Sequence, residues 1–155
     1  MNKLMTFFRQ MIISIAMIMP VSVLAGQVEI VNPYMRELIP GTTVTSSYMK
    51  IINHHNVDIM LVGAKGKFSQ QIELHEHTMK DGMMRMAQVP NIVIPANGSV
   101  MLEPSGLHIM AFDIKQPLKH GQSVELTLLF DEHPPVAIDL PIKSIKQQNN
   151  HHHHH

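Results

Sequence analysis

Cysteine and tryptophan are both missing from this chain of 155 residues, and only 15% of its residues are charged. Without thiols the protein has no disulfide, no thiolate zinc site, no iron–sulfur cluster and no cysteine nucleophile. A blue-copper centre is excluded too, because it needs a cysteine thiolate beside its histidines. Lys and Arg together number 12 and so do Asp and Glu, so no broad basic field favours nucleic acid as a partner.

Long apolar runs are also scarce, and the one near the N-terminus is short. Lys3 and Arg9 precede an almost wholly apolar stretch at residues 11–19, and small residues follow at 23–25. This pattern is typical of a secretory signal peptide, which we assign to residues 1–25. A membrane span needs about 20 apolar residues, so we expect no stable membrane span after cleavage.

Short segments rich in β-branched and aromatic residues alternate with turn signals after residue 25. Residues 44–52 are typical of a strand, and Asp81-Gly82 indicates a tight hairpin turn. No segment in this part shows a convincing amphipathic helical period. We therefore predict a single all-β domain at residues 26–145, built as an antiparallel sandwich or barrel.

Histidine and methionine are abundant, with 12 and 14 residues respectively. Imidazole suits copper, and thioether sulfur is a soft ligand that favours Cu(I). His108 and Met110 lie two residues apart, so one strand would present a nitrogen and a sulfur on one face. If the hairpin turn has two residues, His77 lies directly opposite Met86 and His75 lies diagonal to it. This geometry leaves open whether His77 substitutes for His75 or assists it.

Methionine is also a common filler of hydrophobic cores, which gives a second interpretation for the remaining thioethers. Met79 and Met83 flank the expected turn, where they are either exposed sulfurs that aid copper entry or ordinary surface or core residues. Four others are expected in the core: Met49, Met60, Met84 and Met101.

Four of these side chains have a spacing that resembles a family signature. Ten residues separate His75 from Met86, 21 separate Met86 from His108, and one separates His108 from Met110. The matching segments are residues 47–53, 73–75, 82–86, 106–110, 115–119 and 126–130. Together they resemble the PCu(A)C family, the periplasmic copper chaperones linked to the CuA site of cytochrome oxidase.

The resemblance implies a cupredoxin-like Greek-key β-barrel whose Cu(I) ligands are His75, Met86, His108 and Met110. It also implies a periplasmic Cu(I) chaperone, not an enzyme, that delivers copper toward CuA-site assembly in cytochrome c oxidase. The implied partners are the CuA domain of oxidase subunit II and Sco-type proteins. The alternative is a periplasmic copper storage or tolerance protein without a specific acceptor.

Two positions depart from the family pattern. Glu76 stands where many members have methionine, which removes an optional sulfur and leaves the four-ligand set intact. Ser105 stands where a second glycine is common, and this change affects a turn.

The C-terminal segment, residues 146–155, is polar and ends in five histidines. These histidines are either a native extension or a purification tag. Neutral imidazoles on a flexible tail would suit Cu(II), so a native tail is a candidate Cu(II) site.

Overall fold

A computed structural model describes residues 27–144, and this part of the chain forms strands and no helix. The strands are β1 (Val28–Arg36), β2 (Thr45–Asn53), β3 (Ile59–Lys65), β4 (Gln71–Lys80), β5 (Met83–Gln88), β6 (Ile92–Ile94), β7 (Ser99–Leu102), β8 (Leu107–Phe112), β9 (Ser123–Phe130) and β10 (Val136–Lys143). The all-β prediction is confirmed. The expected signal peptide and the histidine-rich tail both lie outside the described residues. Within residues 27–144 no helix offers the length and apolar character that crossing a membrane would take.

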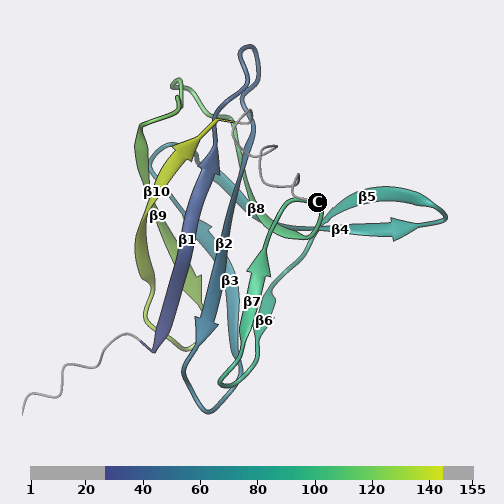
Figure 1. Ribbon diagram of the computed structural model, residues 1–155, viewed down its shortest axis with the longest axis vertical. Helices are drawn as coiled ribbons and strands as arrows, with labels where there is room; N and C mark the ends of the chain where they lie inside the picture. The colour runs from purple at the N-terminus through teal and green to yellow at the C-terminus, as the bar shows by residue number, and fades with distance from the viewer. Residues whose placement is uncertain (1–26, 145–155) are drawn as a thin grey trace, which may run out of the picture.

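Ten strands hydrogen-bond in the order β5-β4-β8-β7-β2-β1-β10-β9-β3-β6. Inward-facing residues of β2 share one hydrophobic core with those of β3 and β9. β2 therefore belongs to one layer of a sandwich, and β3 and β9 belong to the layer that packs against it (Figure 1). The purely antiparallel arrangement expected above is wrong for two pairings. β1 runs parallel to β10, and β7 runs parallel to β8. β1 and β10 are the first and last strands of the described chain, so tertiary packing decides their relative direction. β7 and β8 follow each other across the turn at residues 103–106, and their parallel contact consists of the pair Leu102 and Leu107.

Strand alternation decides which side chains enter the core. Met49 is buried as expected, but Met60, Met84 and Met101 are exposed, so the expected core positions for these three are wrong. Met60 and Met101 each lie between two inward-facing neighbours and therefore point to solvent. Met84 is exposed because its strand does not cover the core.

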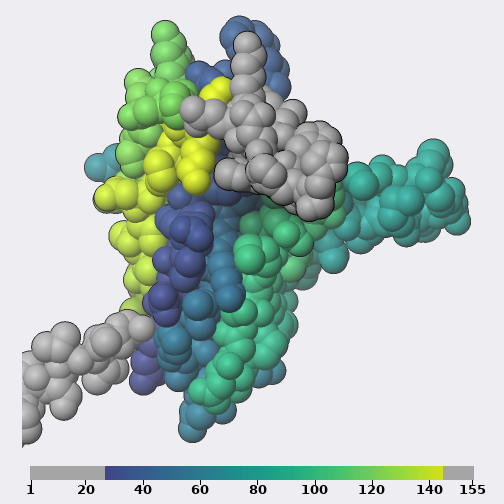
Figure 2. Space-filling view, viewed as in Figure 1, coloured from purple at the N-terminus to yellow at the C-terminus, as the bar shows by residue number. Residues whose placement is uncertain are grey.

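β4 and β5 form a hairpin that projects from the body of the sandwich (Figures 1 and 2). Its loop consists of Asp81 and Gly82, whose φ angles of 54° and 74° are those of a type I′ turn. His77 accordingly pairs with Met86, which confirms the two-residue loop. Every residue of β5 is exposed, so this strand gains little stability from apolar burial.

Candidate metal centre

Three neighbouring strands, β5, β4 and β8, bring the predicted ligands onto one face. His75 on β4 lies directly opposite His108 on β8, and Met110 follows two residues later on the same face of β8. Met86 on β5 lies opposite His77, which places it diagonal to His75. All four predicted ligands therefore share one face of the sheet, although they occupy three strands.

This face is the outer face of the sheet. The alternate residues Leu74 and Ile109 point into the hydrophobic core. His75 and His108 point the other way, yet they are only 9% and 1% exposed. Imidazoles on an outer face stay this dry only when other side chains cover them.

Aromatic rings supply that cover. The ring centroid of His108 lies 4.9 Å from the stacked ring of His77, 5.9 Å from that of His75 and 6.4 Å from that of Tyr48. The ring of Phe112 also contacts His75, with 5.9 Å between ring centroids. The histidines thus sit in a shielded cluster at the base of the hairpin.

One backbone carbonyl fixes the orientation of His108. The Nδ1 atom of His108 lies 2.9 Å from the carbonyl oxygen of Gly106, and only an N–H can donate to a carbonyl. The same oxygen accepts the backbone N–H of His77 at 3.2 Å. In the neutral ring the Nε2 atom of His108 therefore carries a lone pair, and it is buried without a hydrogen-bond partner among the described residues.

Desolvation keeps this ring neutral. Burial is the largest cause of the lowered pKa of His108; the hydrogen bond to Gly106 opposes it in part, and the nearby charged forms of His77, His75 and Arg36 lower this pKa further. A neutral imidazole with a buried lone pair is the form that binds a metal ion.

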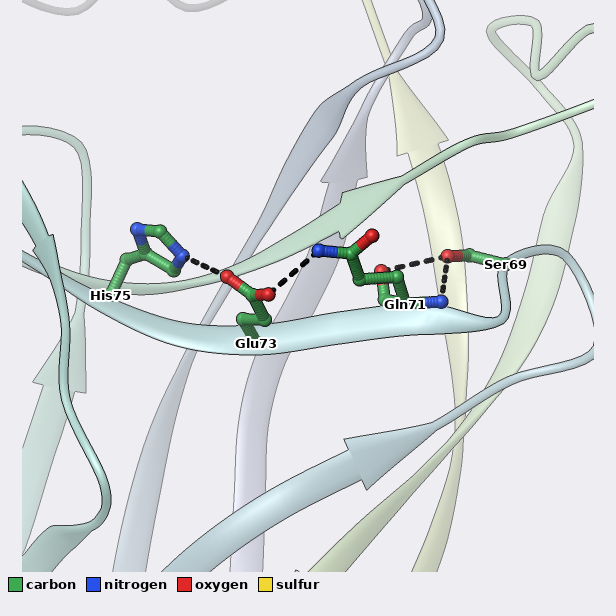
Figure 3. Close-up of polar contacts among 4 residues, drawn as sticks. All are labelled: Ser69, Gln71, Glu73 and His75. Carbon is green, nitrogen blue, oxygen red and sulfur yellow. Dashed lines mark hydrogen bonds and ion pairs between the residues drawn. The ribbon is translucent and has the colours of Figure 1, made fainter.

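A string of polar contacts along β4 orients His75 (Figure 3). Its Nε2 atom lies 2.8 Å from Oε2 of Glu73, whose other oxygen accepts the Gln71 side-chain amide at 2.8 Å. At the start of β4, the hydroxyl of Ser69 donates to the backbone carbonyl oxygens of Gln71 and Phe112 and accepts the backbone N–H of Gln71.

Glu73 determines which nitrogen of His75 is available. The hydrogen bond from Gln71, followed by that from His75, lowers the pKa of Glu73 below its usual value, so its carboxylate accepts the proton of Nε2–H. In the neutral ring, Nδ1 of His75 then carries the lone pair, and it is buried without a hydrogen-bond partner in the described part of the chain. Carboxylate–histidine pairs of this kind commonly orient metal ligands.

Sequence reasoning missed the roles of Glu73 and Tyr48, although both lie in segments that carry the family resemblance. The i, i+2 spacing of Glu73 and His75 on a strand was the available signal for the first. No local signal links Tyr48 to His108, because the contact depends on β2 pairing with β8.

His77 lies two residues after His75 on β4 and therefore belongs to the same face. Its Nδ1 atom is also buried and has no hydrogen-bond partner among residues 27–144. His75 has a carboxylate that orients it and His108 has a carbonyl. The structure shows no corresponding anchor for the ring of His77, which stacks on His108.

The two methionines differ in position. Met110 is half-buried beside His108, whereas Met86 is 47% exposed on the edge strand. They lie two strands and four residues apart, which would separate their Cα atoms by about 17 Å in a flat sheet. A shared ion would therefore require these strands to coil, and Met86 is the predicted ligand that would have the farthest to reach.

The donor set matches a soft, monovalent copper ion. Two neutral imidazole nitrogens and two thioether sulfurs favour Cu(I) over hard cations such as Mg²⁺ or Ca²⁺. Histidine, aspartate and glutamate residues in the described chain do not by themselves form a group of three that could hold a metal ion.

Comparison with known sequences identifies relatives of this chain. The family described as LpqE-like matches residues 28–142. The protein named "Putative lipoprotein Lxx21020" from Leifsonia xyli subsp. xyli is 30% identical over 104 residues, which cover 66% of this chain and 63% of that protein. The uncharacterized protein RP573 of Rickettsia prowazekii is 30% identical over 110 residues, which cover 68% and 61% of the two chains. The chain thus spans a little over three fifths of each relative.

Solved structures share the architecture. Apo-DR1885 from Deinococcus radiodurans is 30% identical with a TM-score of 0.60, and the match covers 78% of this chain and 81% of that one. Its Cu(I) form is 29% identical with a TM-score of 0.62, over 77% and 81% of the chains. The copper-bound PCuAC domain from PmoF2 is 24% identical with a TM-score of 0.66, over 77% and 94%, and shows that the fold is shared.

Proposed function

Because this chain belongs to the LpqE-like family, with the fold of PCuAC domains, we propose that it carries Cu(I) rather than catalysing a reaction. One observation carries the proposal. Two buried imidazoles from different strands, His75 and His108, each keep a nitrogen without a hydrogen-bond partner among residues 27–144, on a face that also bears two predicted thioether ligands. A relative with the same fold, DR1885, has a structure in its Cu(I) form.

We assign four ligands to the ion. His75 would bind through Nδ1 and His108 through Nε2, because hydrogen bonds hold the opposite nitrogens as donors. The sulfurs of Met86 and Met110 complete the set. All four ligands are neutral, so binding releases no proton from the two imidazoles once they are in the neutral form.

A set of this kind suits delivery. Thioethers bind Cu(I) without a thiolate that oxidation would convert to a disulfide, an advantage outside the cytoplasm. The exposed Met86 is the ligand that an acceptor can displace first, while the buried imidazoles still hold the ion. Stepwise exchange then moves copper without releasing it into solution.

The proposed setting is the periplasm. The signal peptide assigned to residues 1–25 would export the domain at residues 26–145, and one relative is itself named as a lipoprotein. The proposed acceptor is the CuA domain of cytochrome c oxidase subunit II, with Sco-type proteins as co-workers. Transfer of bound Cu(I) to an apo CuA domain tests this step, since a storage protein would retain its metal.

Competition with a Cu(I) chelator tests the site. We expect His108→Ala and Met110→Leu to weaken Cu(I) binding by more than about tenfold, since these changes remove direct ligands and loss of supporting groups alone costs about that much. The control is Met101→Leu, an exposed methionine on β7. Each protein carries the same histidine tail, so any tail contribution is constant. Equal affinity of His108→Ala and the parent chain would refute the site.

A further inference from the structure

Four methionines are exposed on the projecting hairpin. Met79, Met83, Met84 and Met86 are 68%, 56%, 58% and 47% exposed. Methionine is among the residues most often buried, so this concentration of exposed thioethers has no explanation in core packing. None of the four belongs to the hydrophobic core or packs against it as a partly buried side chain.

Three of these sulfurs and one imidazole share the site face. Met79 pairs directly with Met84, one step farther along the hairpin than the pair of His77 and Met86. Directly opposed Cβ atoms lie about 5 Å apart, and same-face neighbours on a strand lie about 7 Å apart. The four side chains therefore stand at the corners of a small rectangle, and Met83 lies on the opposite face.

We propose that His77, Met79, Met84 and Met86 form a second, outer Cu(I) site. The inference rests on the proposed function, because it makes this site the entrance to the inner one. Methionine side chains have three rotatable bonds, so sulfurs at these corners can converge on one ion. Three thioethers and one imidazole give a soft donor set without a thiolate, which selects Cu(I).

The imidazole supplies an independent indication of a ligand. Nδ1 of His77 is buried and lacks a hydrogen-bond partner in the described part of the chain. Its ring stacks on that of His108 at 4.9 Å, which places His77 at the boundary between the two sites. An unpaired buried nitrogen costs free energy in the protein alone, and a bound metal ion would remove that cost.

Met86 connects the two sites. Its register places it beside Met84 on one side and diagonal to His75 on the other. Copper would enter at Met79 and Met84, remain on Met86 during the exchange, and then gain His75 and His108 as the outer sulfurs leave. The ion stays Cu(I) throughout, so no electron moves, and all exchanging ligands are neutral.

The test uses the variant Met79→Leu/Met84→Leu in the full chain, which removes both sulfurs and keeps the apolar volume. Met60→Leu/Met101→Leu is the matched control, because these methionines are exposed on β3 and β7. Cu(I) is added from a chelator complex while binding is followed by competition. The ¹³C-labelled methionine methyl groups are followed by NMR.

We expect two bound equivalents in the parent chain. The tighter one should occupy the inner site and shift the methyl signals of Met86 and Met110. With Met86 held by the inner ion, the weaker one should be bound by His77, Met79 and Met84 and shift the methyl signals of these two methionines. The double variant should lose the weaker equivalent, keep the affinity of the tighter one within twofold, and load it several-fold more slowly. The control should match the parent chain.

The outer site is overturned if the Met79 and Met84 methyl signals of the parent chain do not shift at two equivalents of Cu(I), and if the parent chain binds and loads Cu(I) just as the double variant does. Dimerisation through the hairpin, without a metal-induced shift at Met79 or Met84, also overturns it in favour of a docking surface. If the outer site alone fails, Cu(I) affinity still depends on His108. If the proposed function fails, His108→Ala leaves Cu(I) affinity unchanged.

Discussion

The sandwich body and the β4–β5 hairpin place their apolar side chains in opposite ways. In the body Leu126 and Leu140 are fully buried, whereas in the hairpin Met79 and Met84 are mostly exposed. Burial of apolar surface contributes to stability in the first region and very little in the second. Packing explains the apolar residues of the body, whereas for the exposed methionines of the hairpin we propose thioether ligation as the explanation.

The base of the hairpin combines both behaviours. His75 and His108 are buried like core residues, but hydrogen bonds orient them and leave one nitrogen of each without a partner in the described part of the chain. Packing around these two rings holds the lone pairs of His75 Nδ1 and His108 Nε2 in a fixed position, whereas packing in the body only buries apolar side chains. The two regions therefore differ in what their burial achieves, and four experiments test that difference, from the largest expected effect to the smallest.

Leu126→Ala should lower the free energy of unfolding by about 3 kcal/mol, because it opens a cavity in the body. The matched change in the hairpin, Met84→Ala, should lower it by less than about 0.5 kcal/mol, because that side chain is exposed. Urea unfolding of the apo proteins measures both. Similar losses at the two positions would show that the hairpin methionines stabilise the fold and would break the comparison.

Glu73→Gln should weaken Cu(I) binding about tenfold, because a neutral amide holds the Nε2–H of His75 less firmly than a carboxylate does. Glu73 positions a ligand and does not touch the ion, so the stability of the apo protein should change little. Glu125→Gln, an exposed position on β9, is the control. Chelator competition measures the affinities, and equal values for the two variants would exclude a positioning role.

Ser105→Gly should raise the free energy of unfolding by about 1 kcal/mol, because Ser105 has a φ of 69° and a glycine avoids the steric cost of that conformation. This residue lies in the turn before β8. Ser99→Gly, which places glycine in strand β7, should instead destabilise the protein. Thermal or urea unfolding decides the sign at each position.

His133→Asn should raise the pKa of His55 partway toward its ordinary value. The two rings lie 4.5 Å apart, and desolvation first and then His133 lower the pKa of His55. A pKa lowered in the folded state gives stability that is complete above the ordinary value of 6.5 and is lost as pH falls below it. The variant should therefore lose less stability with acid, over a small range.

An NMR titration of the His55 ring measures this pKa, and His120→Asn is the control because His120 lies in another loop. An unchanged pKa of His55 in the His133 variant would mean that burial alone causes the shift. Both proposed copper sites should bind Cu(I) as before, since His55 and His133 lie in the body and outside the hairpin. A change in Cu(I) affinity in the His133→Asn variant would contradict the separation of the body from the copper-binding face.

Local sequence patterns were sufficient for the strands and for the hairpin. Asp81-Gly82 predicted the two-residue turn, and that turn fixed the pairing of His77 with Met86. The i, i+2 spacing of His108 and Met110 placed both on one face of a strand. Local patterns failed for Met84, because methionine itself does not tell whether its strand covers the core or projects from it.

The sequence by itself determined the β-strands, the turn chemistry and a supply of soft ligands without cysteine, because these depend on residues within a few positions of one another. Only the tertiary structure decided that β8 lies beside β4 and places His108 opposite His75. It also decided that the outer face there is dry and that Gly106 and Glu73 each occupy one imidazole nitrogen. Such pairings join distant segments, and they form only when both layers of the sandwich bury a common core.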